Sequence, residues 1–484
     1  MRGLTGDSDE SPTTCMGLET QAAAADKLFT QRCIEPLCQA TFGVDERLYV
    51  CPNCGGLIDI ERTMGFHDPS ALIGLWRERR TSFDAPDRSG VWRFRELLPF
   101  PEDASIVSLQ EGNTPLYQAR HSAHYCNLDL LSLKHQGCNP TGSFKDTGMT
   151  TAITQACRLG SKLVICASTG NTAASLAAYA ARAGIVCAIM VPAGQVSHAK
   201  LAQALDYGAR VLEVEGNFDD CMRVMRQVGE DPSVYLVNSI NPFRIEGQKT
   251  VAAELAEQLG WRSPDHLVIP GGNLGNSSAL GKGFRELFAW GLIDRMPRIT
   301  VVQAAGAAPF ARLFTESAGN LQDGRPGREL VNEPDPHTLA SAIKIGAPIS
   351  WKKAWRSVIE TGGRVITVTE QEIADAKAMI GRDGVGCEPA SATTVAGIRR
   401  LVKEGLIGRN EQVVAVLTGH VLKDTEYAIN YHNNALVANW RSEVEGAGRI
   451  IGHFPNIPMR VAASKEVVQK LLQQLLEEDQ GNKA

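Results

Sequence analysis

The sequence contains no uninterrupted apolar run of about 18 residues, the length that a membrane-spanning helix requires. Basic residues are not in excess either, because 49 Lys and Arg stand against 54 Asp and Glu, a formal net charge of −5. A broad nucleic-acid surface needs a basic excess. We therefore expect neither a membrane nor a nucleic acid among the partners.

The first residues also lack the apolar segment of a secretory signal, since "MRGLTGDSDESPTTC" is polar and acidic. Such a composition is typical of disorder, which we expect for residues 1–20. The twelve cysteines are spread along the chain. Without a secretion signal, most of them should be reduced thiols. A cytoplasmic location follows as the expectation; an organelle matrix is the alternative, which the acidic start disfavours.

From residue 160 onward, short β-branched segments alternate with amphipathic helical segments. The expected strands lie within 162–168, 185–193, 209–216, 234–239, 266–272, 299–305, 364–369 and 412–420. Between the first two, "NTAASLAAYAARAG" predicts a helix that ends at Gly184. This alternation indicates parallel βαβ units, and the continuous apolar runs indicate strands buried on both faces. The sequence thus predicts an α/β fold, interrupted by an irregular segment at 305–350, which is rich in Gly, Pro and polar residues.

Two loops stand between a predicted strand and a predicted helix. The first, in "VIPGGNLGNSS", suits a phosphate, because unpaired N–H groups at a helix N-terminus attract anions; a tight turn without a ligand is the alternative. Its residues are Gly271, Gly272, Asn273, Leu274, Gly275 and Asn276. The second suits a small carboxylate, although an ordinary helix cap explains it equally well. Its residues are Ser168, Thr169, Gly170, Asn171 and Thr172.

Two further segments follow predicted strands. In "VNSINPFRIEGQKT", Arg244 comes five residues after Ser239, and its planar fork suits a phosphate. An ion pair between Arg244 and Glu246 is the alternative. In "AVLTGHVLKD", Thr418 ends a strand, which is where ligands bind in open α/β sheets. Thr418 could equally cap a helix.

Lys145 ends the turn "GCNPTGSFKD", which is rich in Pro, Gly and Ser. Most lysines lie on a solvated surface. Partial burial lowers the pKa of a lysine and frees its amine for Schiff-base chemistry. A carbonyl cofactor that carries a phosphate, such as pyridoxal phosphate, would use both this amine and the glycine loop.

Five motifs taken together resemble the threonine synthase family, pyridoxal-phosphate enzymes of the tryptophan-synthase-β fold type. They are "NPTGSFKD", "ASTGNTAAS", "NSINPFRIEGQKT", "PGGNLGN" and "LTGHVLKD". The segments "SLQEGNTPL", "SAIKIGAP" and "YHNNA" also resemble the plant-type branch. Thr147 and Val421 depart from the family pattern, which puts only the shape of the pocket in question.

The resemblance implies a cofactor site. Lys145 would form the Schiff base with pyridoxal 5′-phosphate and then move protons at the substrate carbons, with Phe144 packed beside the cofactor. Asn171 would hydrogen-bond the 3-hydroxyl of the ring, and Thr418 would face the pyridine nitrogen. The cofactor phosphate would be held by Gly271, Gly272, Asn273, Leu274, Gly275 and Asn276.

The resemblance also implies a substrate, O-phospho-L-homoserine, which would be converted with water to L-threonine and phosphate. Its carboxylate would bind Ser168, Thr169 and Thr172, and its phosphate would bind Asn238, Ser239 and Arg244. A threonine or serine dehydratase, or a cysteate-synthase-like enzyme, is the alternative activity. A retired enzyme that senses metabolites is a third reading, which the intact cofactor groups disfavour. The resemblance further implies two parallel α/β subdomains with the cofactor between them, and a homodimer.

We expect an N-terminal portion at 21–104, a catalytic region at 105–435 with its smaller subdomain at about 155–245, and a C-terminal tail at 436–484. In the N-terminal portion, Cys33, Cys38, Cys51 and Cys54 have the spacing C-x4-C-x12-C-x2-C. This spacing leaves a structural zinc site and reduced, metal-free thiols both open. In the tail, Val468, Leu471, Leu472 and Leu475 form one apolar stripe. We expect this helix to pack on its own protein rather than on a partner.

Overall fold

The computed structural model describes residues 28–194, 198–317, 321–322, 324–440 and 448–481. The expected disorder of residues 1–20 concerns a segment outside these ranges. No helix in the described part is long and apolar enough to cross a membrane.

The larger of two α/β halves is built on a six-stranded sheet with the order β14-β11-β10-β15-β5-β4. Its strands are β4 (Leu116–Gln118), β5 (Leu131–His135), β10 (His266–Pro270), β11 (Arg298–Ala304), β14 (Arg364–Val368) and β15 (Val413–Leu417). All neighbours pair in parallel except β4, which is antiparallel to β5. Alternate side chains point to opposite faces, so Val268 packs under one helical layer and Leu267 under the other.

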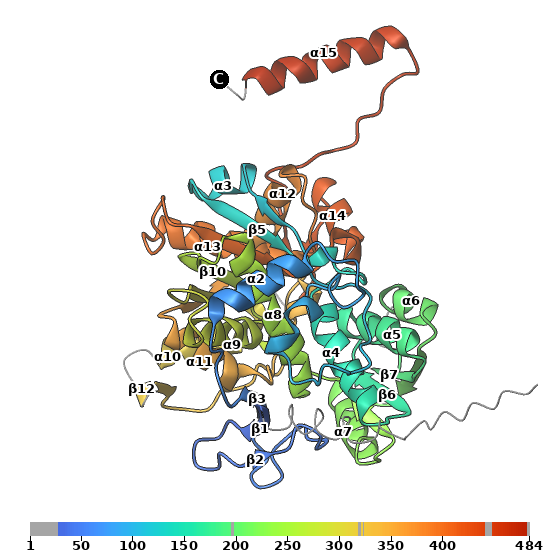
Figure 1. Ribbon diagram of the computed structural model, residues 1–484. Helices are drawn as coiled ribbons and strands as arrows, with labels where there is room; N and C mark the ends of the chain where they lie inside the picture. The colour runs from blue at the N-terminus through green and yellow to red at the C-terminus, as the bar shows by residue number, and fades with distance from the viewer. Residues whose placement is uncertain (1–27, 195–197, 318–320, 323, 441–447, 482–484) are drawn as a thin grey trace, which may run out of the picture.

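The smaller half is a four-stranded parallel sheet with the order β8-β7-β6-β9. Its strands are β6 (Leu163–Ala167), β7 (Val186–Pro192), β8 (Arg210–Val214) and β9 (Val234–Leu236). The strand segments that the sequence predicts in this half are confirmed, and so is the helix end at Gly184, which caps its helix with a left-handed φ of 70°. Figure 1 shows this half beside the larger one, with α5 and α6 on its outer side.

Helices cover both sheets. Those that precede or follow strands of the smaller half are α4 (Lys145–Arg158), α5 (Asn171–Ala183), α6 (His198–Asp206) and α7 (Phe218–Val228). Those of the larger half are α3 (His121–Cys126), α8 (Pro242–Gln258), α9 (Gly275–Ala289), α10 (Pro309–Glu316), α11 (Trp351–Glu360), α12 (Glu370–Arg382), α13 (Pro389–Lys403) and α14 (Thr425–His432). The prediction of an irregular segment at 305–350 is partly wrong, because α10 begins there at Pro309, whose fixed φ favours a first helical turn.

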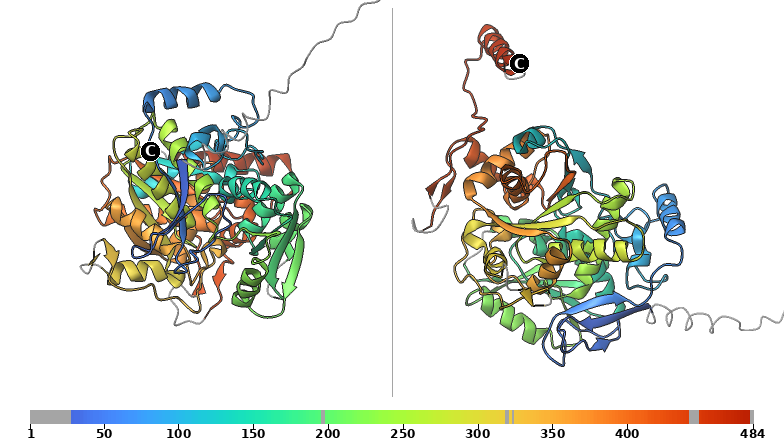
Figure 2. Two further views of the ribbon diagram at one scale, coloured as in Figure 1. Left: turned by 60° about the horizontal axis from the view of Figure 1, so that its bottom comes forward. Right: turned by 90° about the vertical axis from the view of Figure 1, so that its left-hand side faces the viewer.

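The N-terminal module (residues 28–62) is a small antiparallel sheet that contacts both halves. Its strands are β1 (Phe29–Cys33), β2 (Thr41–Phe42) and β3 (Ile58–Arg62). On one side, the Tyr49 hydroxyl accepts from the amide of Leu236 at 2.8 Å, on the edge strand β9. On the other side, the buried carboxylate of Asp59 pairs with Lys282 of α9 at 3.1 Å and with Arg356 of α11 at 3.1 Å. Figures 1 and 2 show this module at one end of the molecule.

After the module the chain forms α2 (Pro69–Arg79) and the 3₁₀ helix η1 (Trp92–Leu97) before it enters the larger sheet. Short 3₁₀ turns also occur in the larger half at η2 (Gln136–Cys138), η3 (Ala305–Ala307), η4 (Ser341–Ile343) and η5 (Val421–Lys423). Two minor strand pairs complete the described part, β12 (Leu321–Gln322) with β13 (Arg325–Pro326) and β16 (Val437–Ala438) with β17 (Gly448–Arg449).

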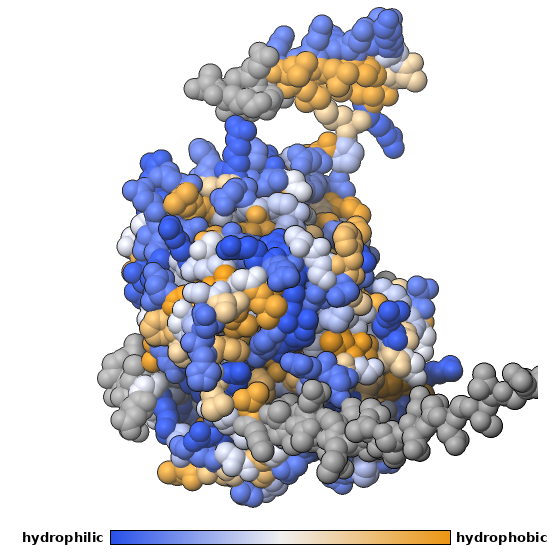
Figure 3. Space-filling view, viewed as in Figure 1, coloured by the Kyte–Doolittle hydropathy of each residue, from blue (hydrophilic) through white to orange (hydrophobic). Residues whose placement is uncertain are grey.

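The final helix, α15 (Lys465–Gly481), stands away from the rest of the molecule (Figure 1). Its apolar side chains are exposed, with Leu472 at 54% and Leu476 at 63% of their full exposure. The stripe that they form is visible in Figure 3. The expectation that this helix packs on its own protein is therefore not met, because the extended segment before it holds the stripe clear of the body.

Candidate active site

Lys145 is the first residue of α4, and the turn before it is tied to the end of β15. The amide of Phe144 donates to the carbonyl of Thr418 at 2.9 Å, and Ser143 bridges to Gly419. The carboxylate of Asp146 closes the same turn, because it accepts from the Thr141 amide at 2.7 Å and from its hydroxyl at 2.6 Å. The rigid, polar turn thereby fixes one amine at the carboxyl end of a central strand.

The Lys145 amine lies in a setting that favours its neutral form. Burial, and then the positive charge of Arg244, lower its pKa from 10.5 to about 7, against the opposing charge of Glu388. The ammonium nitrogen is 4.0 Å from the centroid of the Phe144 ring. An amine with this pKa is partly unprotonated near neutral pH and can act as a nucleophile or a base.

The loop at residues 168–172 connects β6 to α5 and keeps its side chains free of helix capping. The helix begins at Asn171 with Gly170 as its cap residue, and no side chain makes a cap hydrogen bond. The ordinary helix cap, which the sequence left open, is therefore not what this loop forms. Ser168, Thr169 and Thr172 are partly exposed in the described structure. Asn171 differs from them, since its Nδ2 donates to Glu388 Oε2 at 3.0 Å.

The glycine loop connects β10 to α9, which begins at Gly275. A Cβ on Gly271 would lie 2.7 Å from Cγ1 of Val301, so glycine is required there. Leu274 adopts a left-handed φ of 65°, which turns the chain into the helix. The side-chain nitrogen of Asn276 is buried without a hydrogen-bond partner in the described structure. A helix N-terminus with an unsatisfied buried donor is an environment that an anion would complete.

Arg244 lies on the first turn of α8, and only 3% of its surface is exposed. One guanidinium nitrogen donates to the Val237 carbonyl at 3.2 Å, while Nε has no partner. The alternative pairing with Glu246 does not occur, because Glu246 pairs with Lys249 at 2.6 Å and with Lys282 at 2.5 Å. Within the described chain no carboxylate forms an ion pair with Arg244. Burial lowers its pKa to about 10, so the group stays charged at neutral pH.

Asn238 and Ser239 follow β9 and already have partners. The side-chain amide of Asn238 accepts from the Ala167 amide and donates to its carbonyl, both at 3.1 Å. The hydroxyl of Ser239 accepts from Asn273 Nδ2 at 2.8 Å. These bonds tie the ends of β6 and β9 to each other and to the glycine loop. The predicted site residues 168, 238, 239 and 271–276 therefore lie near one another, each just after the carboxyl end of its strand.

Thr418 follows β15, and its side chain contacts a residue that the sequence did not single out. Its hydroxyl donates to Glu388 Oε1 at 3.2 Å, and it lies 3.1 Å from the Ser391 hydroxyl. It does not cap a helix, because His420 occupies that position for η5. Glu388 was missed although "CEPASA" offered a signal, since a Glu directly before the Pro that starts a helix is an uncommon cap residue.

Pyridoxal phosphate fits these groups. The unpartnered Asn276 nitrogen and the free start of α9 suit a phosphate ester, and the pKa of the Lys145 amine suits an aldehyde. Asn171 and Thr418 offer one hydrogen-bonding group each from the two α/β halves. These residues would hold the cofactor between the halves.

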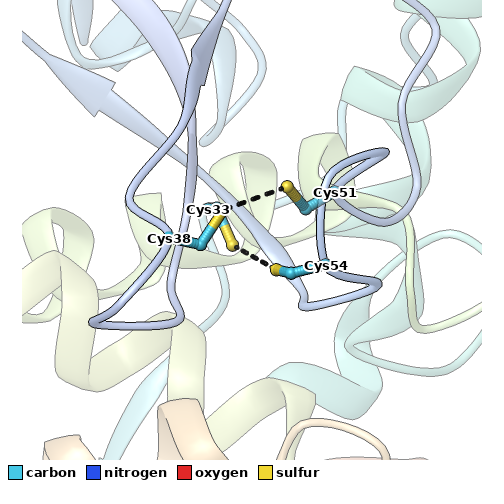
Figure 4. A group of neighbouring side chains, drawn as sticks. All are labelled: Cys33, Cys38, Cys51 and Cys54. Atoms are coloured by element: carbon cyan, nitrogen blue, oxygen red, sulfur yellow. Dashed lines mark hydrogen bonds between the residues drawn. The ribbon is translucent and has the colours of Figure 1, made fainter.

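The four N-terminal cysteines converge in space. Their sulfur atoms all lie within 4.8 Å of one another, with Cys33 and Cys54 3.4 Å apart and Cys38 and Cys51 3.6 Å apart. Figure 4 shows Cys33, at the end of β1, and Cys38 on one side, facing Cys51 and Cys54 on the other. Four thiolates around a tetrahedral zinc ion, with Zn–S bonds of about 2.3 Å, would stand about 3.8 Å apart. The residues present therefore fit a zinc ion.

Known proteins resemble the chain in both sequence and fold. The sequence profile of pyridoxal-phosphate dependent enzymes matches residues 107–419. A threonine synthase of Methanocaldococcus jannaschii is 44% identical over 400 residues, which cover 82% of this chain and 94% of that protein. A threonine synthase of Synechocystis is 44% identical over 75% of this chain and 91% of its own.

Solved structures share the fold at lower identity. A fungal L-serine ammonia-lyase from Rhizomucor miehei has a TM-score of 0.56 at 20% identity, over 68% of this chain and all of that one. A threonine deaminase from Solanum lycopersicum has a TM-score of 0.54 at 21% identity, over 65% of this chain and 83% of that one. The sequence identity to the two threonine synthases is about twice the identity to these two solved structures. The match to the threonine synthases also spans 94% and 91% of their lengths. The chain belongs to the threonine synthase family of pyridoxal-phosphate dependent enzymes.

Proposed function

We propose that this protein converts O-phospho-L-homoserine and water to L-threonine and inorganic phosphate. The observation that carries the proposal is the buried guanidinium of Arg244, which has no carboxylate partner in the described chain and whose charge lowers the pKa of Lys145. A buried charge is costly unless an ion of opposite sign joins it. The phosphate of this substrate supplies that ion, whereas threonine and serine, the substrates of a dehydratase, carry no phosphate.

The remaining residues take roles that follow from their positions. Hydroxyls of Ser168, Thr169 and Thr172 bind the substrate carboxylate at the start of α5, where the helix dipole favours an anion. The Ser239 hydroxyl is bonded to Asn273 of the glycine loop. The amide of Asn238 is occupied by Ala167. We therefore assign Asn238 a supporting role, which is to fix the loop that carries Ser168, rather than direct contact with phosphate.

The chemistry requires proton transfers at neighbouring substrate carbons. When bound, pyridoxal phosphate supplies an aldehyde and a sink for electrons. Lys145 removes and returns protons at those carbons, because its pKa lies close to neutral pH. Phe144 packs beside the amine. Arg244 holds the phosphate that leaves, and water then adds to the carbon skeleton.

The proposal is tested with purified, cofactor-loaded protein and O-phosphohomoserine. We expect phosphate and threonine in equal amounts. The variant Arg244→Lys, which keeps a charge but loses the planar fork, should raise the KM for O-phosphohomoserine at least about tenfold. The control Arg328→Lys, on the surface, should behave as wild type. Release of 2-oxobutyrate from threonine without phosphate release from O-phosphohomoserine would instead identify a dehydratase.

Three finer expectations accompany this function. We infer a plant-type threonine synthase, a homodimer and a cytoplasmic location. The plant-type assignment is supported by the segments at 108–116, 341–348 and 431–435. Residues 21–104, 105–435 and 436–484 are the N-terminal, catalytic and tail portions in this proposal, with a smaller subdomain at about 155–245. Light scattering on the purified protein tests the homodimer, and a monomer mass would contradict it.

We further infer that Cys33, Cys38, Cys51 and Cys54 hold one structural zinc ion, because their sulfur atoms already converge. Metal analysis of the purified protein should give one zinc per chain. Cys38→Ser should lower that value, whereas Cys138→Ser, an exposed cysteine outside the cluster, should not. Folded wild-type protein without bound zinc would contradict the proposal and show that the four cysteines are metal-free thiols.

A further inference from the structure

A cavity that the function described above does not use lies between α12, α14 and two loops. Its volume is about 270 Å³, and its walls include both helices, the segment at 385–387 and Asn456. The two helices are neighbours (Figure 1), and their buried faces meet in one hydrophobic cluster. The short side chains of Ala374, Ala378 and Ala428 leave this space open. The cavity is therefore close to the lower end of the size range of small-molecule sites, about 300 Å³.

Two cationic side chains of α12 line the cavity, Lys377 and Arg382. Neither forms an ion pair or a side-chain hydrogen bond with a residue in the described ranges. Lys377 Nζ lies 6.0 Å from the centroid of the Tyr427 ring. Arg382 Cζ lies 5.2 Å from the centroid of the Phe454 ring. Contacts with ring faces leave the N–H donors of both side chains unused.

His432 of α14 adds a neutral donor to the same cavity. Its Nδ1 accepts from the Asn456 amide at 3.0 Å, and a ring nitrogen that accepts carries no proton. The proton of the neutral ring is therefore on Nε2. Burial, and then the positive charges of Lys377 and Arg382, lower the pKa of His432 below its ordinary 6.5, so the ring is neutral at neutral pH.

The buried carboxylate of Asp375, also on α12, is already satisfied by other groups. One oxygen accepts from the Tyr431 hydroxyl at 2.8 Å, and the other lies 2.7 Å from Nδ1 of His453. Two positive charges and one neutral donor thus remain for a ligand. A phosphate group carries a charge of about −1.5 to −2 at neutral pH, which matches two cations better than the single charge of a carboxylate. The planar fork of Arg382 also suits phosphate oxygens.

Val421 forms part of the wall, and there the chain departs from the family pattern. A Cβ on Gly386 would lie 2.7 Å from Cγ1 of Val421, so the glycine makes room for the valine. The neighbouring Cys387, also in the wall, is bridged to His420. The departure at Val421 therefore changes the shape of this cavity.

We propose that this cavity binds a phosphate dianion, either inorganic phosphate or a small phosphate monoester. Lys377 supplies a point charge, Arg382 a fork of two N–H groups, and His432 a third donor through Nε2. The alanine side chains leave space for the short organic part of an ester. Arg244, which the proposed function assigns to the phosphate of the substrate, is not among the residues of this cavity.

The test measures protection of Lys377 in the cofactor-loaded wild-type protein. An amine-reactive acetyl ester labels accessible lysines, and peptide mass spectrometry gives the labelling rate of each lysine separately. Inorganic phosphate at about ten times its Kd should slow the labelling of Lys377 about tenfold, because only the unoccupied fraction reacts. Sodium chloride of equal ionic strength is the reference. Lys403, which is exposed on α13, should react at the same rate in both solutions.

Two further probes and one variant identify the ligand. Protection by glycerol 3-phosphate as well would identify a monoester site, and protection by inorganic phosphate alone would identify a site for free phosphate. Acetate should not protect Lys377. In Arg382→Gln, phosphate should no longer slow the labelling of Lys377, while Lys403 reacts as in wild type.

Labelling of Lys377 that neither phosphate slows, or that acetate slows equally, would overturn the proposal. Protection that persists unchanged in Arg382→Gln would also contradict it. The measurement is local to Lys377 and involves no turnover. Its result is therefore independent of phosphate bound at Arg244 and of whether the protein converts O-phosphohomoserine.

Discussion

At the scale of single residues, Lys145 and Asp146 show how burial acts on neighbours of opposite charge. Burial lowers the pKa of the lysine to about 7 and raises that of the aspartic acid to about 6. The two groups do not form an ion pair. Asp146 accepts from Thr141 and Ser175, and so organises the turn that presents the amine.

Lys145 makes the stability of the cofactor-free protein depend on pH. The folded chain releases the Lys145 proton at about pH 7, but the unfolded chain holds it up to about 10.5. The unfolded state binds more protons in this window, so the free energy of unfolding should rise with pH. Lys145→Met should stabilise the protein below pH 7, by about 3 kcal/mol after allowance for partial exposure, and the gain should vanish by pH 10.5.

Chemical denaturation of the two cofactor-free proteins between pH 6.5 and 10.5 measures this difference. A second lysine provides the control, since Lys344→Met removes an exposed positive charge and tests the effect of losing a lysine as such. A difference that stays constant with pH for Lys145→Met would show that burial does not lower the pKa of the Lys145 amine.

Gly419 provides a second test at this scale. Alanine there would place its Cβ 2.6 Å from both carboxyl oxygens of Glu388, so the carboxyl group must move away from Asn171 and Thr418. We expect Gly419→Ala to weaken cofactor binding at least about tenfold, as loss of two hydrogen bonds would. Gly381→Ala, on α12 with open space around it, should bind the cofactor as wild type. Equal affinities in a fluorescence titration of the two variants would show that the carboxyl group adapts.

At the scale of elements, strand β3 is joined to the larger half by buried charges. Asp59 pairs with Lys282, Lys353 and Arg356, and these positive charges hold its pKa well below the usual range. Lys282 also donates to the Ile60 carbonyl and pairs with Glu246 of α8. The charges thus connect the N-terminal module to the helices that carry Arg244 and the glycine loop.

Asp59→Asn should destabilise the protein by about 3–5 kcal/mol, because it leaves buried positive charges without their partner. Glu61→Gln on the same strand removes an exposed pair with Arg32 and should cost less than about 1 kcal/mol. Urea denaturation at neutral pH compares the two variants. If the two variants lost a similar free energy of unfolding, the charges around Asp59 would have to be solvated by water.

The elements that the sequence predicts correctly are those whose local pattern agrees with their burial. The helix α5 ends where Gly184 permits a left-handed cap, and most of the predicted strands are buried apolar runs. The predicted strand β8 forms at an edge of its sheet but is largely exposed, so the expected burial on both faces is wrong there. Strand β5 was not predicted, because it contains Lys134, which is buried and satisfied by Glu254 and Gln258 from α8. Glu388 was missed although "CEPASA" marks it as an uncommon cap residue, because its partner Asn171 lies 217 residues away and only the fold brings the two together.

At the scale of the whole molecule, none of the described apolar side chains of α15 belongs to a hydrophobic cluster of the body. Deletion of residues 464–484 should therefore leave the thermal midpoint of the cofactor-loaded protein unchanged. It should also remove the exposed apolar stripe of Val468, Leu472, Leu475 and Leu476. Differential scanning calorimetry of the full and shortened chains checks this expectation, with deletion of residues 28–62 as the destabilising comparison. A lower midpoint for the shortened chain would show that the helix packs on the body in solution.

The N-terminal module has a mechanical consequence, because its two sides are attached with unequal strength. The contacts with the smaller half are hydrogen bonds such as the one from Leu236 to Tyr49, the ring contact of Tyr49 with Tyr235 and a partly exposed ion pair of Asp45 with Arg158. The contacts with the larger half include several ion pairs of the buried Asp59 carboxylate. If the two halves rotate apart, the weaker attachment opens first, and the module travels with the larger half as a brace that limits how far the smaller one can swing.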